Sequence, residues 1–458
     1  MDELTGLDTS FLTLETDGEH LHVAGLYVFE PPADPTIDLL ATLRSSLEAR
    51  LHLVPRYRQR LQSMPLGIDH PVWVDDDRFD LAHHVVAHEL PAPGGHGELI
   101  TLCERLHARQ LNRRRPLWEV HLITGLEGGR FATFSKTHHA VLDGMGGNDV
   151  TKLLLDAERH PEPVAAPVWM PRPAPSAAHL VRRSARRTVG RPATVARLVG
   201  DGLRFGRAAL RGSGSGRVAT ARRTSLNGTI GARRTYAVGA VDLDELKIVK
   251  KELGGTINDV VLAMCAGALR DELRERGEST TRRLSAFVPV SVRTNHDEIN
   301  NQISGMLVEL PVEMNDPHMR YRATVHSADR SKGQLGTLRA GTLADVADLV
   351  PPAIGAPLAQ LAHRAGLRNV LPPAANLTIS NVPGPREPLY AAGSRLLEYY
   401  PCPPINDAMS LNVTCLSYLD RMYFGVAGDP ELLPDVQRLV DRLLEHLDVL
   451  ASLSPTTP

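Results

Sequence analysis

The fold is decided by a single stretch, Ser135-Lys136-Thr137-His138-His139-Ala140-Val141-Leu142-Asp143-Gly144-Met145-Gly146-Gly147. Residues 131–134 before it resemble the end of a strand, and residues 150–157 after it carry apolar side chains at helical spacing. The glycines permit sharp or positive-φ turns. The stretch therefore predicts a strand-to-helix corner that holds its side chains firmly beside a cavity.

Two adjacent histidines, His138 and His139, are the residues of this corner best suited to catalysis. Neighbouring side chains on an extended segment point to opposite sides, so we expect one imidazole to react and the other to support it. A neutral imidazole can accept the proton of an attacking hydroxyl. A surface turn with two incidental histidines is the alternative. A metal site is disfavoured because no Glu or Cys stands at ligand spacing beside them.

The composition describes a globular chain. It has 458 residues, of which 42% are hydrophobic and 23% charged, with a formal net charge of -2. This length predicts two domains of about 150 to 220 residues each. The near-neutral charge excludes a global attraction to nucleic acid or membrane, so any such contact must come from a local patch. The four cysteines are widely spaced, which predicts reduced thiols rather than a zinc or disulfide framework.

The start of the chain and its apolar runs bear on targeting. Residues 1–6 lack the basic and apolar regions of a secretory signal, and no apolar run of about 20 residues is present. These features predict a cytoplasmic protein with at most peripheral membrane contact.

A basic segment follows the catalytic corner. The run 161–175 is rich in proline, and residues 182–234 contain fourteen arginines against one acid, Asp201. Basic segments with interleaved apolar residues bind anionic membrane surfaces, with roughly 1 kcal/mol from each basic residue. We therefore interpret 182–234 as a membrane-surface segment. A disordered linker is the alternative, and nucleic-acid binding is disfavoured because interleaved aromatic residues are scarce.

Periodic patterns predict the other elements. Helices are expected at 38–53, 96–109, 243–253, 256–276 and 434–450, and strands at 20–29, 71–74, 116–122, 282–293, 301–308 and 377–382. His20 and His22 share one face of the first strand, and we expect them to be solvated near an edge, with a place in a cavity wall as the alternative. Trp118 is expected to pack against the sheet.

The motif His138-His139-Ala140-Val141-Leu142-Asp143-Gly144 resembles the HHxxxDG signature of three families. These are chloramphenicol-acetyltransferase-like acyltransferases, peptide-synthetase condensation domains, and bacterial wax ester synthase/acyl-CoA:diacylglycerol acyltransferases. Further stretches are similar to the last family, in its order: 7–30, 116–118, 225–234 and Asn381-Val382-Pro383-Gly384-Pro385. The chain is therefore identified as a member of that family, of the actinobacterial triacylglycerol synthase type.

The resemblance implies an α/β fold with two chloramphenicol-acetyltransferase-like domains, each with a mixed sheet, and an interdomain tunnel. The expected divisions are an N-terminal domain with the motif at 1–165, a Pro- and Arg-rich connector at 166–235 and a C-terminal domain at 236–458. The resemblance implies no metal and no cofactor, with acyl-CoA as co-substrate.

The implied activity is transfer of a long-chain acyl group from acyl-CoA to the hydroxyl of diacylglycerol, which makes triacylglycerol. His139 is the expected general base and His138 supports it. No Ser or Cys nucleophile stands at the motif, so no acyl-enzyme intermediate is expected. Long-chain alcohols as acceptors, in a wax ester synthase, and a non-catalytic lipid-surface protein of the same fold are the alternatives. The expected location is cytoplasmic, on the inner face of the plasma membrane or on lipid droplets.

The resemblance also implies the residues that surround the base. Asp143 and Gly144 are expected to shape the catalytic loop, and Arg293 to pair with Asp143. The resemblance further implies that Asn258 and Asp259 border the active site.

Two of these roles have competing explanations. Thr256 and Asp259 are spaced as a helix-capping pair, which explains Asp259 without a substrate and leaves Asn258 as a polar liner of the site. Ser410 and Thr414 are candidates for steadying an oxyanion, among several hydroxyl groups between 410 and 417.

Overall fold

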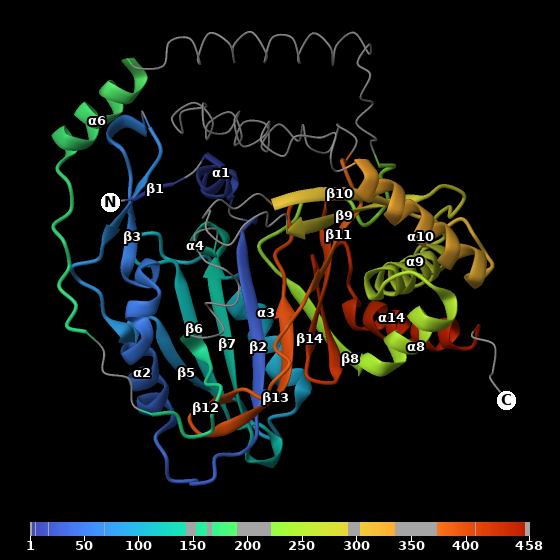
Figure 1. The fold of residues 1–458 in the computed structure, drawn as a ribbon, viewed down its shortest axis with the longest axis horizontal. Coiled ribbons are helices and arrows are strands. Elements are labelled where there is room, and N and C mark those ends of the chain that lie inside the picture. Colours follow the sequence, from blue (N-terminus) through green and yellow to red (C-terminus); the bar gives the residue numbers. More distant parts are fainter. Residues whose placement is uncertain are drawn as a thin grey trace.

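The structure is a computed structural model that describes residues 2–4, 6–16, 18–67, 69–142, 153–162, 167–189, 221–291, 303–334, 373–407 and 409–453. In this part of the chain, two six-stranded sheets lie side by side and a small three-stranded sheet lies beyond the first of them (Figure 1). The expected residues Asp143, Gly144 and Arg293 lie outside the described residues.

The first large sheet is organised around β7 (Phe131–His138). Its strand order is β12-β13-β2-β7-β6-β5, with β2 (His22–Phe29), β6 (Trp118–Thr124) and β5 (Val85–Glu89). Every residue of β7 is buried, which is typical of a strand covered on both faces. Apolar residues of α2 (Leu39–Arg50) and α3 (His96–Ala108) pack with the sheet in one core.

Two strands of this sheet come from the far end of the chain. They are β12 (Tyr390–Ala391) and β13 (Ser394–Cys402), and β13 pairs antiparallel with β2. As a result β2 is an interior strand, and the expectation that His20 and His22 are solvated was wrong. Their exposures are 6% and 1%, and their rings stack with centroids 5.4 Å apart.

The second large sheet has the strand order β10-β9-β11-β14-β15-β8. Its strands are β8 (Thr235–Asp242), β9 (Leu284–Ser291), β10 (Ile303–Leu310), β11 (Leu377–Val382), β14 (Leu411–Tyr418) and β15 (Arg421–Gly428). Strand β11 runs parallel to β9 and β14, and the other pairs are antiparallel. In the first sheet, β5 and β6 are the parallel pair. Both sheets are therefore mixed, which confirms the expected α/β fold.

Helices cover the second sheet on the right of Figure 1. They are α8 (Leu243–Leu253), α9 (Ile257–Glu275), α10 (Pro317–Gln334) and α14 (Val436–Ala451). No helix of the described chain meets by itself the length and hydropathy needed to cross a membrane, although α8 and α9 do so together across a bend of 95°. Most residues of α9 are buried in the core. The four cysteines are free and buried.

The three-stranded sheet contains β1 (Asp2–Glu3), β4 (Val72–Asp75) and β3 (Gln59–Gln62). The short helix η3 (Pro65–Gly67) follows β3, and α6 (Ala177–Val189) packs on this sheet through Leu180. The chain continues from β1 into α1 (Gly6–Leu14), which contacts α4 (His139–Leu142). The small sheet is thus connected directly to the catalytic corner.

A buried lysine joins β7 to α3. Lys136 is 0% exposed, and its Nζ donates to the carbonyl oxygens of Leu106 and Arg109, each at 2.8 Å, and lies 3.3 Å from Glu119 Oε2. The last carbonyls of a helix lack intrahelical donors and favour a cation. Lys136 therefore caps α3 from inside the protein, although burial lowers its pKa against the opposing effect of Glu119.

Lys136→Met is expected to lower the free energy of unfolding by about 2 to 4 kcal/mol, because it leaves buried acceptors without their donor. Urea titration measures this difference. Lys250→Met on the exposed surface of α8 is the control and should stay within about 0.5 kcal/mol of the wild type. A Lys136→Met protein as stable as the control would show that the buried ammonium does not hold α3.

Candidate active site

The catalytic corner is sharper than the sequence pattern predicts. Strand β7 continues to His138 because both neighbours pair with it to its end, with His22 opposite His138 and Trp118 opposite Thr137. Helix α4 then begins at His139, whose N–H donates to the carbonyl of Leu21 at 2.9 Å. The two imidazoles therefore leave the backbone from different elements.

Both ring nitrogens of His138 are occupied. Nδ1 accepts the Ala140 backbone N–H at 3.0 Å, and Nε2 lies 2.9 Å from Glu15 Oε1. An acceptor Nδ1 carries no proton, so the ring proton is on Nε2 and is donated to Glu15. The side chain is 2% exposed. His138 therefore has no free lone pair for a substrate, and it positions the backbone just after His139.

Glu15 is the centre of a buried polar cluster. Its carboxylate accepts hydrogen bonds from the Leu21 backbone N–H at 3.3 Å, from Gln110 at 3.2 Å, and from His138 and Arg113. Burial alone would raise the pKa of Glu15, but His138 and the Arg113 charge outweigh it and lower the pKa to about 2. The carboxylate is therefore ionised wherever the protein is folded near neutral pH.

His139 is half-buried and lies against an aromatic ring. The ring of Phe11 in α1 is 4.6 Å from the imidazole, centroid to centroid, at an angle of 53°. Phe11 thus covers one side of the imidazole. Neither Glu15 nor Phe11 was singled out from the sequence, where both stand in the opening stretch 7–30 with no local pattern that links them to the histidines.

Two further buried histidines, His22 and His107, are kept neutral by their surroundings. The ring of His22 is 5.8 Å from that of His138, and burial and the Lys136 charge hold its pKa well below the usual value. Burial and the Arg234 charge lower the pKa of His107 to about 3. These imidazoles add no positive charge beside the catalytic corner near neutral pH.

Trp118 packs as expected. Its side chain is 0% exposed, its Nε1 donates to the carbonyl of Tyr57 at 2.9 Å, and its ring stacks between Tyr57 and His84. The prediction of a buried tryptophan in the sheet is confirmed.

Asp259 forms the helix cap that its spacing indicates. The Thr256 side chain accepts the Asp259 backbone N–H at 3.3 Å, and Asp259 Oδ2 accepts the Thr256 backbone N–H at 2.8 Å. This capping box starts α9. Asn258 is half-buried beside it. Substrate contact by Asn258 and Asp259 stays a prediction.

Ser410 and Thr414 are buried in the second sheet. The Ser410 hydroxyl donates to the Leu226 carbonyl, and the Thr414 hydroxyl donates to Asn412 at 3.1 Å. Each hydroxyl proton is used in these contacts. Oxyanion contact by Ser410 and Thr414 stays a prediction, and the predicted ion pair of Asp143 with Arg293 lies outside the described residues.

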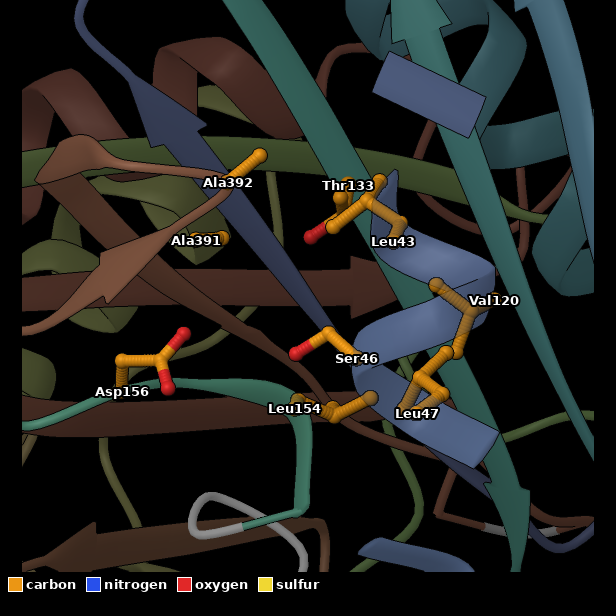
Figure 2. A pocket seen from close by; sticks show the side chains of 9 residues that line it. All are labelled: Leu43, Ser46, Leu47, Val120, Thr133, Leu154, Asp156, Ala391 and Ala392. Carbon is orange, nitrogen blue, oxygen red and sulfur yellow. The ribbon is translucent and has the colours of Figure 1, made fainter. Parts of the chain in front are cut away.

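Two cavities of the described part lie away from His139. Figure 2 shows the first, lined by nine side chains from α2, β6, β7, residues 154–156 and residues 391–392. Its volume of about 10 Å³ is close to the minimum that one water molecule needs. Asp156 in its wall pairs with Arg50. The second is an open groove of about 660 Å³ between α3 and the end of β5. The expected interdomain tunnel therefore stays a prediction. In the described residues, no three His, Cys, Asp or Glu side chains could together hold a metal ion.

Two family models match most of the chain. Residues 4–261 match the model of the wax ester synthase/diacylglycerol acyltransferase catalytic domain, and residues 299–451 match that of the C-terminal domain of the same enzymes. The chain belongs to this family. The prediction from the HHxxxDG motif and its accompanying stretches is confirmed.

The sequence similarity of the acyltransferase to its relatives extends over nearly its whole length. A Mycobacterium tuberculosis protein named as a diacylglycerol O-acyltransferase is 37% identical over 450 residues, covering 98% of this chain and 99% of the relative. Another from the same species is 34% identical over 454 residues and covers 98% of each chain. The structure of the wax ester synthase/diacylglycerol acyltransferase from Marinobacter aquaeolei VT8 is similar with a TM-score of 0.70 at 30% identity, covering 99% of this chain and 100% of that one.

Structures of other acyl-transferring proteins share the fold. The first condensation domain of the calcium-dependent antibiotic synthetase matches with a TM-score of 0.57 at 16% identity. The trichothecene 15-O-acetyltransferase from Fusarium sporotrichioides matches with a TM-score of 0.59 at 13% identity. At these identities the similarity concerns the architecture alone.

Proposed function

We propose that the protein transfers a long-chain acyl group from acyl-CoA to the free hydroxyl of a diacylglycerol, which forms triacylglycerol and CoA. Membership of the family and the names of the full-length mycobacterial relatives support this activity. One observation in the site carries the mechanism: both nitrogens of His138 are engaged, whereas His139 begins α4 half-buried. His139 is therefore the imidazole that meets the substrates.

In this mechanism His139 accepts the proton of the acceptor hydroxyl as its oxygen attacks the thioester carbonyl. The carbon–sulfur bond then breaks, and the imidazolium returns the proton to the departing thiolate. General base catalysis of this kind contributes about 10²- to 10⁴-fold. Holding the two substrates together, with donors at the oxyanion, supplies the remainder.

The cysteines give no support to a covalent acyl-enzyme. Burial raises the pKa of Cys103 and Cys415 far above the usual thiol value, and that of Cys265 to about 12. A protonated, buried thiol is a poor nucleophile. Direct transfer between two bound substrates agrees with these environments.

Release of CoA thiol from palmitoyl-CoA tests the activity. The assay would run with diolein, with hexadecanol and with no acceptor, and lipid products would be separated by thin-layer chromatography. Triacylglycerol with diolein supports the proposal. Release that no acceptor stimulates would contradict it, and no release above the enzyme-free background with any acceptor would favour a non-catalytic lipid-surface protein.

Wax ester synthesis is the second candidate activity. It is favoured by the full-length similarity to the Marinobacter protein, whose name includes both reactions. The same base would activate either hydroxyl, because the chemistry at His139 does not depend on what the hydroxyl is attached to. A hexadecanol rate above the diolein rate would make this the main activity.

Peripheral contact with a lipid surface, on the cytoplasmic side of the membrane or on lipid droplets, is part of the proposal. The acceptor is itself a lipid that resides in such surfaces. The basic segment 182–234 supports the contact, and its described portion in α6 exposes Arg182 and Arg186.

Phe11 is expected to keep water from the catalytic imidazole. Phe11→Ala should raise acceptor-independent hydrolysis of palmitoyl-CoA relative to transfer by about 2- to 10-fold, which corresponds to the 0.5 to 1.5 kcal/mol of an aromatic contact. The ratio of free fatty acid to triacylglycerol measures it. Phe11→Leu retains an apolar cover and is the control. An unchanged ratio in Phe11→Ala would mean that the ring only packs.

A further inference from the structure

We infer that the protein meets its lipid surface through one rim of the small sheet, made by η3 and α6, which contact each other. The rim consists of two exposed apolar side chains and two arginines: Leu66, Val181, Arg182 and Arg186. Its partner is an anionic phospholipid surface. This inference rests on the proposed function and names the contact through which the acceptor lipid is reached.

One large apolar side chain of the rim is almost fully exposed. Leu66 is 91% exposed, and Val181 in α6 adds 41%. Leu66 stands at the tip of η3 with a φ of 57°, a left-handed conformation that disfavours leucine. Single exposed apolar residues are ordinary, but a nearly fully exposed leucine beside a basic helix that contacts the same turn indicates a contact surface.

The segment that leads into α6 is held against the small sheet. Arg172 donates to Asp75 of β4 through its backbone N–H and its guanidinium, with distances of 3.0 to 3.1 Å. Gln62 of β3 donates to the Pro175 carbonyl at 3.0 Å. Trp169 packs edge to face on Phe79. The chain therefore enters α6 from a fixed position on the small sheet.

Helix α6 supplies the charge. Leu180 and Ser184 are buried, and Leu180 packs on Met64 and Val72 of the small sheet. Arg182 and Arg186 are exposed and point away from that buried side, because residues two and six positions after Leu180 lie on the other side of a helix. The helix contains no acidic residue. A basic, partly apolar helix of this kind suits anionic headgroups.

The rim lies close in the fold to the catalytic corner. Strand β1 pairs with β4 of the small sheet, and the chain then enters α1, which contacts α4 and covers His139 with Phe11. In Figure 1, α6 and α1 both lie in the upper left part of the view. The rim is thus joined through β1 and α1 to the corner that holds His139.

Flotation of the full-length protein with vesicles tests the inference. The vesicles would contain phosphatidylcholine alone or phosphatidylcholine with phosphatidylglycerol, and wild-type protein is expected to float with the anionic vesicles. Each of Arg182→Gln and Arg186→Gln should weaken partitioning about fivefold, since a basic residue near such a surface contributes roughly 1 kcal/mol. Leu66→Asn removes the apolar side chain at the tip of η3, and asparagine tolerates the left-handed conformation of this position. The variant that combines Leu66→Asn with both arginine substitutions, the rim variant, should not float.

Matched controls lie on α8, in the other large lobe. Ile248 is 55% exposed, and Lys250 and Lys251 are exposed, so Ile248→Asn with Lys250→Gln and Lys251→Gln removes similar groups. This control should float like the wild type. Equal flotation of rim variant and control would overturn the inference, as would wild-type protein that ignores anionic vesicles or binds duplex DNA instead.

Activity separates this inference from the proposed function. With dispersed dioctanoylglycerol, the rim variant should keep the wild-type rate within about twofold, while its rate on diolein in anionic vesicles falls at least about tenfold. A rim variant that loses both rates but floats normally would reject the inference that the rim is the lipid contact. No release of CoA by wild-type protein with any acceptor would reject the proposed function and leave the flotation result standing by itself.

Discussion

His139→Ala is expected to lower kcat for transfer from palmitoyl-CoA to diolein by about 10²- to 10⁴-fold, the usual contribution of a general base. His139 is the first residue of α4, is half-buried against Phe11, and is adjacent to a histidine whose ring is fully engaged. The substitution removes the proton acceptor while the cluster around Glu15 stays in place. Initial rates of CoA release measure the loss.

The fold of His139→Ala should be retained, because the hydrogen bonds of Glu15 with His138 and Arg113 do not involve the His139 side chain. The thermal midpoint should stay within a few degrees of the wild type. His83→Ala is the matched control, since the His83 side chain is 47% exposed on the surface. Wild-type turnover by His139→Ala would contradict the assignment of the base.

Glu15→Gln is expected to lower kcat by about 10²-fold while the KM for palmitoyl-CoA changes little. Glu15 accepts the His138 ring proton, and His138 in turn accepts the Ala140 N–H, so the carboxylate fixes the first turn of α4. A displacement of about 1 Å at a catalytic group can cost about 10²-fold. Steady-state kinetics with both substrates varied measure the split between kcat and KM. A purely structural Glu15 would reduce the yield of folded enzyme but leave kcat per active site unchanged.

The pH dependence of stability gives an independent measurement of the same residue. The pKa of Glu15 is lowered in the folded state from 4.5 to about 2, so its ionised form stabilises the fold. That contribution is complete above about pH 4.5 and is lost as the pH falls toward 2. Glu15→Gln should lack this acid-dependent loss, while Glu431→Gln, at a side chain with 74% exposure, should behave like the wild type. Identical acid profiles for wild type and Glu15→Gln would contradict a buried carboxylate at this position.

Elements with strong local patterns were predicted well from the sequence. The helix expected at 243–253 has those same bounds, and that expected at 256–276 became α9 with its capping box. Apolar spacing and a Thr–Asp pair report on neighbours three or four residues away, which local patterns specify. The two histidines were also identified as unequal, because alternation along an extended chain is a local property. The length of strand β7 was underestimated, because its extension to His138 depends on pairing with β2 and β6.

The sequence by itself determined the family, the α/β class, most helices and strands, and the pair of histidines at which the chemistry is expected. Tertiary structure decided the rest. It placed β13 beside β2, it buried His20 and His22, and it brought Glu15 to His138 and Phe11 to His139. These contacts join segments that are distant along the chain. Local spacing records only neighbouring residues, whereas burial and pairing depend on which segments the folded chain packs together.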